Sequence, residues 1–194
     1  MKTVSPSLGP CAATIRHVPR GDKLALHLRA MTRVLGIDPG LRLTGYGLVD
    51  VIAGQFQPRL VEAGVIQLDP KTSMESRLVQ LYHDLDALLE QFEPDDLAVE
   101  KLYSHYAHPR TAIIMGHARG VILLAGKKRG LNLVDLPATE VKKAVTGHGH
   151  ASKEQMQLAV QSQCNLAQPP SPPDVADAIA VALCHARRLA IQHL

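Results

Sequence analysis

The stretch that most constrains the fold runs from Arg33 to Asp50 and reads RVLGIDPGLRLTGYGLVD. An apolar run stops in it at Asp38, a proline and a glycine follow, and a second strand-like run begins a few residues later. Proline presets φ and glycine accepts positive φ, so Asp-Pro-Gly predicts a turn between two antiparallel strands. The turn alone gives Asp38 a structural purpose, because an aspartate there accepts local hydrogen bonds.

The rest of the chain predicts further strands and then alternating helices. Three strand-like runs joined by short turns are typical of an antiparallel meander. Thr72-x-x-Glu75 and Ser152-x-x-Gln155 each predict a capping box at the start of a helix, and Ser171 is the predicted N-cap of the last helix. This order predicts an α/β fold with one five-stranded mixed sheet flanked by helices. The expected strands are 33–38, 44–51, 60–68, 96–102 and 131–136, and the expected helices are 72–92, 110–129, 139–146, 152–165 and 171–192.

The composition is that of a globular domain. A chain of 194 residues is long enough to bury a sizeable core, and no apolar run approaches the roughly 18 residues of a membrane span. We therefore expect no membrane contact. The three cysteines, Cys11, Cys164 and Cys184, form no CxxC pair, which favours reduced thiols and a cytoplasmic location.

Residues 1–30 contain several prolines, show no periodic pattern and directly precede a second methionine, Met31. We expect either an ill-ordered N-terminal arm or an extension upstream of a functional start at Met31, with the folded domain over residues 31–194. Mass spectrometry of the natively produced protein distinguishes the two.

Charge is unevenly distributed along the chain. Residues 62–100 carry ten acidic and two basic side chains, whereas residues 101–153 carry nine basic and two acidic ones. A domain with separate acidic and basic blocks can bind a polyanion on one face, although two solvated faces of opposite sign explain the pattern equally well. Within the basic block, residues 127–130 (KKRG) suit either a DNA-binding patch or the end of a helix.

Three further carboxylates lie at positions where a purely structural role explains an acidic residue less well than it does at Asp38. Glu100 ends an apolar run expected in the middle of the sheet, and Asp174 and Asp177 lie three residues apart in the first turn of the last helix, hence on one face. If they converge with Asp38 at the strand ends, four carboxylates repel one another unless a cation is present. Oxygen ligands of this kind suit Mg²⁺ or Mn²⁺, and two such ions promote phosphodiester hydrolysis.

Five motifs in order resemble the RuvC family of Holliday-junction resolvases: GIDPGLRLTGYGLVD, AVEKLY, MGHARG, VKKAVTGHGHASKEQM and PPDVADAIAVALCHA. The similarity extends over nearly all of residues 33–187. It implies an RNase H-like fold and a homodimer that resolves four-way DNA junctions by symmetric paired nicks in recombination and repair. It also implies a nucleoid-associated enzyme that works with the RuvA–RuvB branch-migration complex.

By this resemblance, Asp38, Glu100, Asp174 and Asp177 are the catalytic acids that bind two Mg²⁺ ions, with Mn²⁺ as an alternative. The expected products carry a 5′-phosphate and a 3′-hydroxyl. We also expect the glycines of the first motif, Gly40, Gly45 and Gly47, to leave room for a DNA backbone.

Three further positions match DNA-binding residues of the family. Lys142 and Lys153 correspond to lysines near the scissile phosphate, and Tyr103 stands where an aromatic ring, commonly Phe, stacks on a base. Lys143 is expected to be a solvated helix residue instead.

Other interpretations of the sequence are weaker. The pairs His105/His108 and His148/His150 have no nearby cysteine, which disfavours a zinc site. An ATPase of the actin and sugar-kinase type needs a duplicated, longer domain, and a binding-only module does not need four acids. A related RNase H-like nuclease that acts on another branched or hybrid nucleic acid remains the main alternative.

Overall fold

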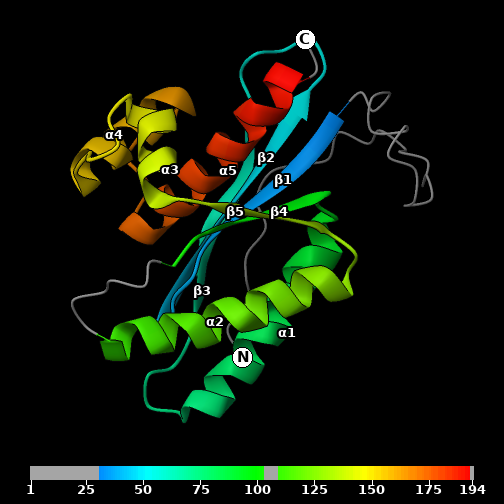
Figure 1. Cartoon of the computed structure of the whole chain (residues 1–194), viewed down its shortest axis with the longest axis vertical. Helices are drawn as coiled ribbons and strands as arrows, with labels where there is room; N and C mark the ends of the chain where they lie inside the picture. The colour runs from blue at the N-terminus through cyan, green and yellow to red at the C-terminus, as the bar shows by residue number, and fades with distance from the viewer. Residues whose placement is uncertain (1–30, 103–108, 193–194) are drawn as a thin grey trace.

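The computed structural model of the chain describes residues 31–102 and 109–192, which form one five-stranded sheet covered by helices on both faces (Figure 1). The predicted mixed-sheet α/β architecture is confirmed. The order of the strands across the sheet is β3-β2-β1-β4-β5. The strands are β1 (Met31–Asp38), β2 (Leu43–Ile52), β3 (Arg59–Gln67), β4 (Asp96–Glu100) and β5 (Asn132–Leu136), and the helices are α1 (Met74–Phe92), α2 (Pro109–Lys128), α3 (Ala138–Thr146), α4 (Lys153–Gln163) and α5 (Pro173–Gln192).

Strand β1 occupies the centre of the sheet and changes its pairing mode from one side to the other. It pairs antiparallel with β2, as the short turn after Asp38 requires, and parallel with β4. Strand β5 continues the parallel half beside β4. The carboxyl ends of three strands, β1, β4 and β5, therefore lie at one edge of the sheet.

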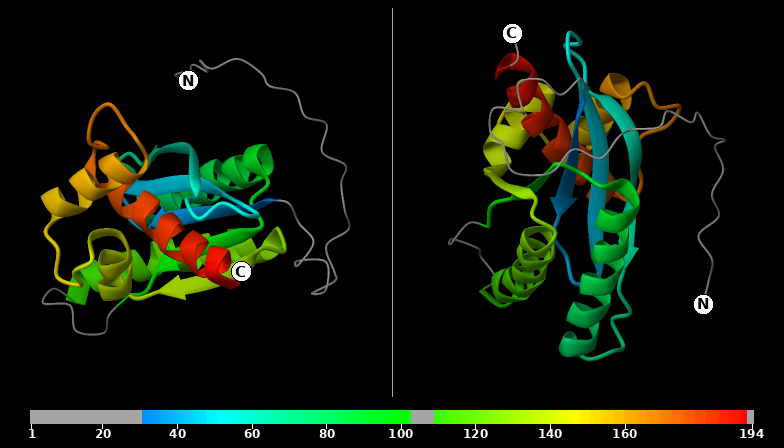
Figure 2. Two further views of the ribbon diagram at one scale, coloured as in Figure 1. Left: turned by 90° about the horizontal axis from the view of Figure 1, so that it is seen from above. Right: turned by 90° about the vertical axis from the view of Figure 1, so that its right-hand side faces the viewer.

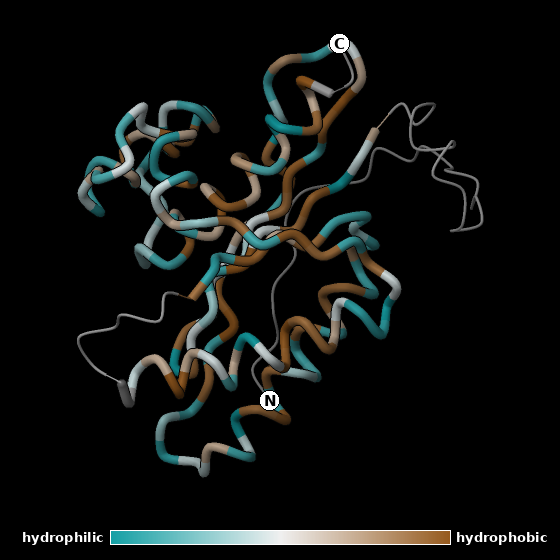
Figure 3. The backbone as a smooth tube through the Cα atoms, viewed as in Figure 1, coloured by the Kyte–Doolittle hydropathy of each residue, from teal (hydrophilic) through white to brown (hydrophobic). Residues whose placement is uncertain are grey.

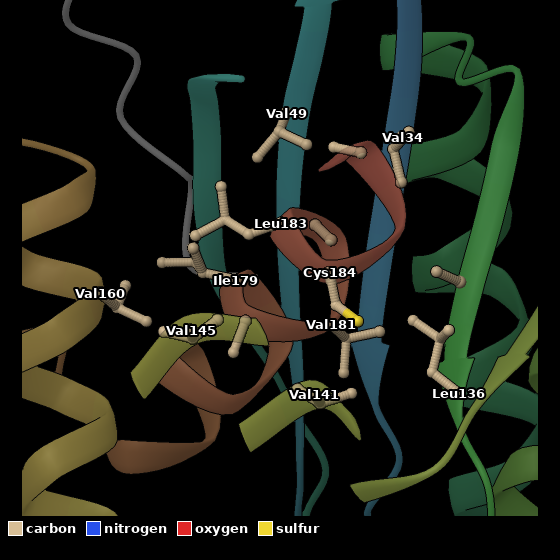
Figure 4. Packing of buried hydrophobic residues seen from close by; sticks show 14 of the residues in the cluster. Val34, Val49, Leu136, Val141, Val145, Val160, Ile179, Val181, Leu183 and Cys184 are labelled. Atoms are coloured by element: carbon tan, nitrogen blue, oxygen red, sulfur yellow. The ribbon is translucent and has the colours of Figure 1, made fainter. Parts of the chain in front are cut away.

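Two hydrophobic cores lie on the two faces of this sheet. Helices α1 and α2 cover one face, and α5 covers the other together with α3 and α4 (Figures 1 and 2). Alternating strand residues enter each core: Leu35 and Ile37 pack toward α1 and α2, whereas Val34 packs toward α5. Figure 3 shows the apolar residues concentrated along the strands, and Figure 4 shows Ile179 and Leu183 of α5 near Val49 of β2.

Two predicted helix starts are wrong by one or two residues. The N-cap of α1 is Ser73, whose side chain accepts a hydrogen bond from the backbone N–H of Ser76, while the Thr72 hydroxyl donates to the carbonyl of Asp69 in the preceding turn. Helix α5 begins at Pro173, so Ser171 is not adjacent to its first residue. The predicted capping box at the start of α4 is confirmed.

The KKRG segment ends helix α2 and joins it to α1. Gly130 has a φ of 74°, which suits the predicted helix end. Lys128 donates to the hydroxyl of Tyr82 at 2.7 Å, and both the Nε and Nη2 of Arg129 donate to the carboxylate of Asp86 at 2.6 Å. Part of the basic block therefore pairs with part of the acidic block inside the domain.

No helix within the described ranges is long and apolar enough to cross a membrane.

Candidate active site

Asp38 and Glu100 end two neighbouring parallel strands. Ile37 of β1 lies level with Val99 of β4, so the acid after each of them lies at the same edge of the sheet. Ile37 and Val99 both belong to the core under α1 and α2. Because side chains alternate along a strand, both carboxylates point to the opposite face, where α5 lies.

Helix α5 brings Asp174 and Asp177 to this edge because its backbone packs directly on β1 and β2. A Cβ atom on Gly45 would lie 2.1 Å from the carbonyl oxygen of Asp174, and one on Gly36 would lie 2.4 Å from backbone atoms of α5. Gly45 is also the residue of β2 that pairs with Asp38. The glycine therefore places the start of α5 beside the first acid.

The glycines of the first motif are required by the packing of this chain. A Cβ on Gly47 would lie 2.8 Å from the Cα of Ile179 in α5, and one on Gly40 would lie 2.0 Å from the carbonyl oxygen of Leu43 within its own turn. Together with Gly45, these residues admit the backbone of this chain. The direction that a Cβ would take is filled by α5 or by the turn itself, and room for a DNA backbone at these glycines stays a prediction.

All four predicted acids line one cleft of about 690 Å³, called the carboxylate cleft below. Lys142 of α3 and Lys153 of α4 line it on the α5 side of the sheet. Arg42, in the turn after β1, and Arg77 of α1 also line it. Lys143 is exposed and does not line the cleft. The cleft thus combines four carboxylates with cations that come from separate elements.

Asp38 is the most strongly perturbed acid in the cleft. Burial is the largest cause, and with the nearby carboxylates of Asp177, Glu100 and Asp174 it raises the pKa of Asp38 from 3.8 to about 8. The ammonium group of Lys153 opposes this shift. Burial and the neighbouring carboxylates therefore favour the protonated form of Asp38 at neutral pH.

The pKa values of two other acids are raised for similar reasons. Burial raises the pKa of Glu100, Asp177 adds to the effect, and Lys142 lowers it. Burial also raises the pKa of Asp177, where Lys153 and Lys142 oppose the shift and Asp174 adds to it. The two lysines are thus close enough to act electrostatically on the acids.

The donor set of the cleft suits a hard cation. In the described part of the chain, no three His, Cys, Asp or Glu side chains form one group that could hold a metal ion. Mg²⁺ is commonly held by one or two carboxylates together with water and phosphate oxygens, and a cation would relieve the repulsion that perturbs Asp38. The residues present therefore fit such an ion.

Two residues that the sequence did not single out hold the turn after Asp38. The Thr44 hydroxyl donates to the carbonyl of Gly40 at 2.6 Å and accepts from its N–H at 3.3 Å. Arg77 donates from Nη1 to the carbonyl of Leu41 at 3.0 Å. Thr44 lies within the first quoted motif, but no local pattern indicates Arg77, which is 36 residues away from its partner.

The remaining predicted positions are an aromatic residue and two histidine pairs. Tyr103 lies outside the described residues, as do His105 and His108. His148 and His150 are exposed near the end of α3.

Comparison with known proteins gives a consistent assignment. Residues 34–185 match the family model described as crossover junction endodeoxyribonuclease RuvC. The chain is 46% identical over 153 residues to the RuvC of Rhodopirellula baltica, covering 78% of this chain and 84% of that protein. It is 40% identical over 154 residues to the RuvC of Desulforamulus reducens, covering 79% of this chain and 93% of that one.

A solved structure agrees with this comparison. The RuvC of Thermus thermophilus in complex with a Holliday junction substrate superposes with a TM-score of 0.76 and 32% sequence identity, covering 84% of this chain and 97% of that one. The fold of the chain is therefore that of RuvC, which is RNase H-like.

Proposed function

The chain belongs to the RuvC family of crossover junction endodeoxyribonucleases, and from that premise we propose that it resolves four-way (Holliday) DNA junctions. It acts as a structure-selective nuclease in recombination and repair and nicks two strands symmetrically. The observation that carries the proposal is the carboxylate cleft, where acids from two strand ends and one helix lie beside cations suited to phosphate. A related protein with 32% identity is known in complex with a Holliday junction substrate.

The enzymes of this family are metal-dependent, and we assign the metal ligands to Asp38, Glu100, Asp174 and Asp177. Two Mg²⁺ ions, or Mn²⁺ in their place, would supply an activated water and neutralise the charge that develops on the phosphate. The chain's own part is to hold the four carboxylates on a rigid sheet edge and helix. In-line attack on the phosphorus atom then breaks the bond to the 3′ oxygen and leaves a 5′-phosphate and a 3′-hydroxyl.

The DNA contacts we propose are made by two lysines of the cleft and by one aromatic residue. Lys142 and Lys153 bind phosphate oxygens through their ammonium groups, since both line the cleft with the acids. Tyr103 stacks on a base near the crossover, a role that follows from its place three residues after Glu100 and from the family pattern.

We propose that the active form is a homodimer and that it joins through the exposed face of α2. Ile113 and Leu124 on this face are 61% and 55% exposed. Between them, a Cβ on Gly120 would have no atom within 4 Å, so the packing of the described residues does not require a glycine there. A glycine inside a helix costs about 0.5–1 kcal/mol relative to alanine. Close approach of a second copy of the chain explains why a glycine is present at this position despite its cost in helix stability.

The substrate implies the partners and the place of action. We propose that the dimer acts on chromosomal junctions in the cytoplasm, with a RuvA–RuvB complex that moves the crossover to the preferred site.

The decisive experiment compares the wild type with Asp38→Asn on a synthetic four-way junction in Mg²⁺ or Mn²⁺. The wild type is expected to produce paired symmetric nicks, and the variant to bind the junction without cleaving it. Linear duplex of the same sequence is the control substrate. Equal cleavage of junction and duplex would contradict junction selectivity.

The same assay separates the main alternative, an RNase H-like nuclease for other substrates. An RNA–DNA hybrid and a three-way branch are added as competing substrates. Preference for either over the four-way junction would favour that alternative.

A further inference from the structure

Arg119, in the MGHARG motif of α2, contacts the ends of two strands at once. Its Nε donates to the backbone carbonyl of Glu100 at 3.3 Å, and its Nη2 donates to the carboxylate of Asp135 on β5. The Arg119 side chain is only 18% exposed. Asp135 lies level with Val99, the residue before Glu100. One guanidinium therefore ties α2 to the strand end that carries the second acid.

The carbonyl of Glu100 needs such a donor because of Pro39. Gly36 lies level with Ala98 in the parallel pairing of β1 with β4. In this register the next carbonyl of β4 that faces β1 belongs to Glu100, and its donor would be the backbone nitrogen of residue 39. Proline has no N–H. The Arg119 side chain supplies the hydrogen bond that the sheet cannot make.

The other side of the same peptide bond is also held. The N–H of Lys101 donates to the carbonyl of Leu136 on β5 at 2.8 Å. The peptide between Glu100 and Lys101 is thus fixed by a strand on one side and by Arg119 on the other. Its orientation sets the direction in which the Glu100 side chain leaves the backbone.

We propose that Arg119 is a positioning residue for Glu100, and that Asp135 orients Arg119. The inference rests on the proposed nuclease function. Arg119 touches the carbonyl of Glu100 and not its carboxylate, so it acts through backbone geometry. A shift of about 1 Å in a catalytic group can cost on the order of a hundredfold in rate.

The test measures cleavage of a four-way junction under single-turnover conditions at saturating enzyme, with junction affinity measured separately in EDTA. Arg119→Met removes both hydrogen bonds and keeps an unbranched side chain of similar length. Arg119→Lys keeps one cationic donor. Arg129→Met is the matched control, because Arg129 follows α2 directly and pairs with Asp86 and Glu90 of α1 instead of the cleft.

We expect Arg119→Met to cleave about tenfold to a hundredfold more slowly while its junction affinity stays within about twofold of the wild type. Arg119→Lys should recover part of the rate. Asp135→Ala should slow cleavage when it is introduced into the wild type. It should have little further effect in the Arg119→Met background, because both changes disrupt the same hydrogen-bonded pair. Arg129→Met should lose thermal stability to a similar extent and keep the wild-type rate.

Three results would overturn the inference: equal rates for Arg119→Met and Arg129→Met, a parallel loss of junction affinity, or fully additive effects of Asp135→Ala. If Arg119→Met does not fold, the inference is tested with Arg119→Lys and Asp135→Ala. Each of them should cleave more slowly than the wild type at an unchanged junction affinity. A wild type that does not cleave junctions refutes the proposed function instead. The two failures are therefore distinguishable.

Discussion

Asp38 lies in an environment where the ionised form of its carboxylate is electrostatically unfavourable. Burial and three neighbouring carboxylates raise its pKa to about 8, so its ionised form is unfavourable at neutral pH. The turn that follows it is held by Thr44 and by Arg77. The chain thus fixes this carboxylate where a bound cation, like the ammonium of Lys153, would favour its ionised form.

This arrangement predicts a pH-dependent stability for the metal-free protein. The folded protein binds the Asp38 proton more tightly than the unfolded chain, whose pKa is near 3.8, so stability is lost as the pH rises from about 4 through about 8. In EDTA, the melting temperature should fall between pH 5.5 and pH 8.5 by an amount equivalent to about 1–3 kcal/mol. Asp38→Asn should remove this part of the decline, and Mg²⁺ or Mn²⁺ should reduce it in the wild type. Identical pH profiles for the two proteins would contradict the prediction.

Lys153 is a second residue whose role can be measured directly. If its ammonium binds a phosphate, Lys153→Gln should weaken junction binding about equally for all sequences and reduce the slope of log K against log salt by about one. Lys143→Gln is the control, because Lys143 is exposed and does not line the cleft. Binding titrations over a range of salt concentrations test this, and an unchanged slope for Lys153→Gln counts against the contact.

At the level of elements, the glycine-lined contact between α5 and the sheet decides where two of the acids lie. Gly36, Gly45 and Gly47 allow the helix backbone to approach β1 and β2 more closely than any side chain would permit. A helix of this length with an apolar face could pack on the sheet in many ways. The small residues select the one in which its first turn reaches the end of β1.

A single methyl group at this contact should therefore affect catalysis. In Gly45→Ala, the new Cβ would lie 2.1 Å from the carbonyl oxygen of Asp174, so the start of α5 must move. We expect a loss of about 1–3 kcal/mol in stability and a cleavage rate at least about tenfold lower. Gly47→Ala is the matched control, since it crowds Ile179 further along the same helix. It should destabilise the fold similarly but slow cleavage less, as measured by denaturant unfolding and junction cleavage.

At the level of the whole molecule, the cleft lies at the edge where β1, β4 and β5 end, with contributions from helices on both faces. Members of the two charge blocks of the sequence lie close to one another in the described part of the fold. Some of their members pair internally, as Arg129 does with Asp86, while Lys142 and Lys153 meet the acids in the cleft. The cleft therefore contains both cations that could bind a phosphate and carboxylates that could bind a metal ion.

The proposed dimer gives a prediction at the same scale. Leu124→Glu introduces a charge on the exposed face of α2 and should convert the dimer to monomers at micromolar concentration, as measured by analytical ultracentrifugation. Paired nicking of junctions should be lost with it. Leu158→Glu, at a similarly exposed position of α4 (58%), should remain dimeric. If Leu124→Glu remains dimeric, the interface does not include this face of α2.

Much of the fold follows from local patterns in the sequence. Apolar alternation and turn residues predicted all five strands and all five helices to within about two residues at most ends. The errors at Thr72 and Ser171 have a local cause: several residues that can cap a helix, or begin its first turn, lie next to one another. Glu100 was singled out from the sequence because a carboxylate at the end of a buried strand is costly when it is unpaired, whereas the full set of four acids came from the resemblance to the RuvC family.

Only the tertiary structure decided how these pieces act together. It brought Asp38, Glu100, Asp174 and Asp177 to one cleft, and it showed that Gly45 and Gly47 admit a helix. It also paired Arg119 with a carbonyl 19 residues away. Such contacts depend on strand register and helix approach, which are set by packing over the whole domain. A sequence pattern predicts the local conformation of a segment from residues that are close along the chain. The chemistry of this site depends instead on residues that are close in space but distant along the chain.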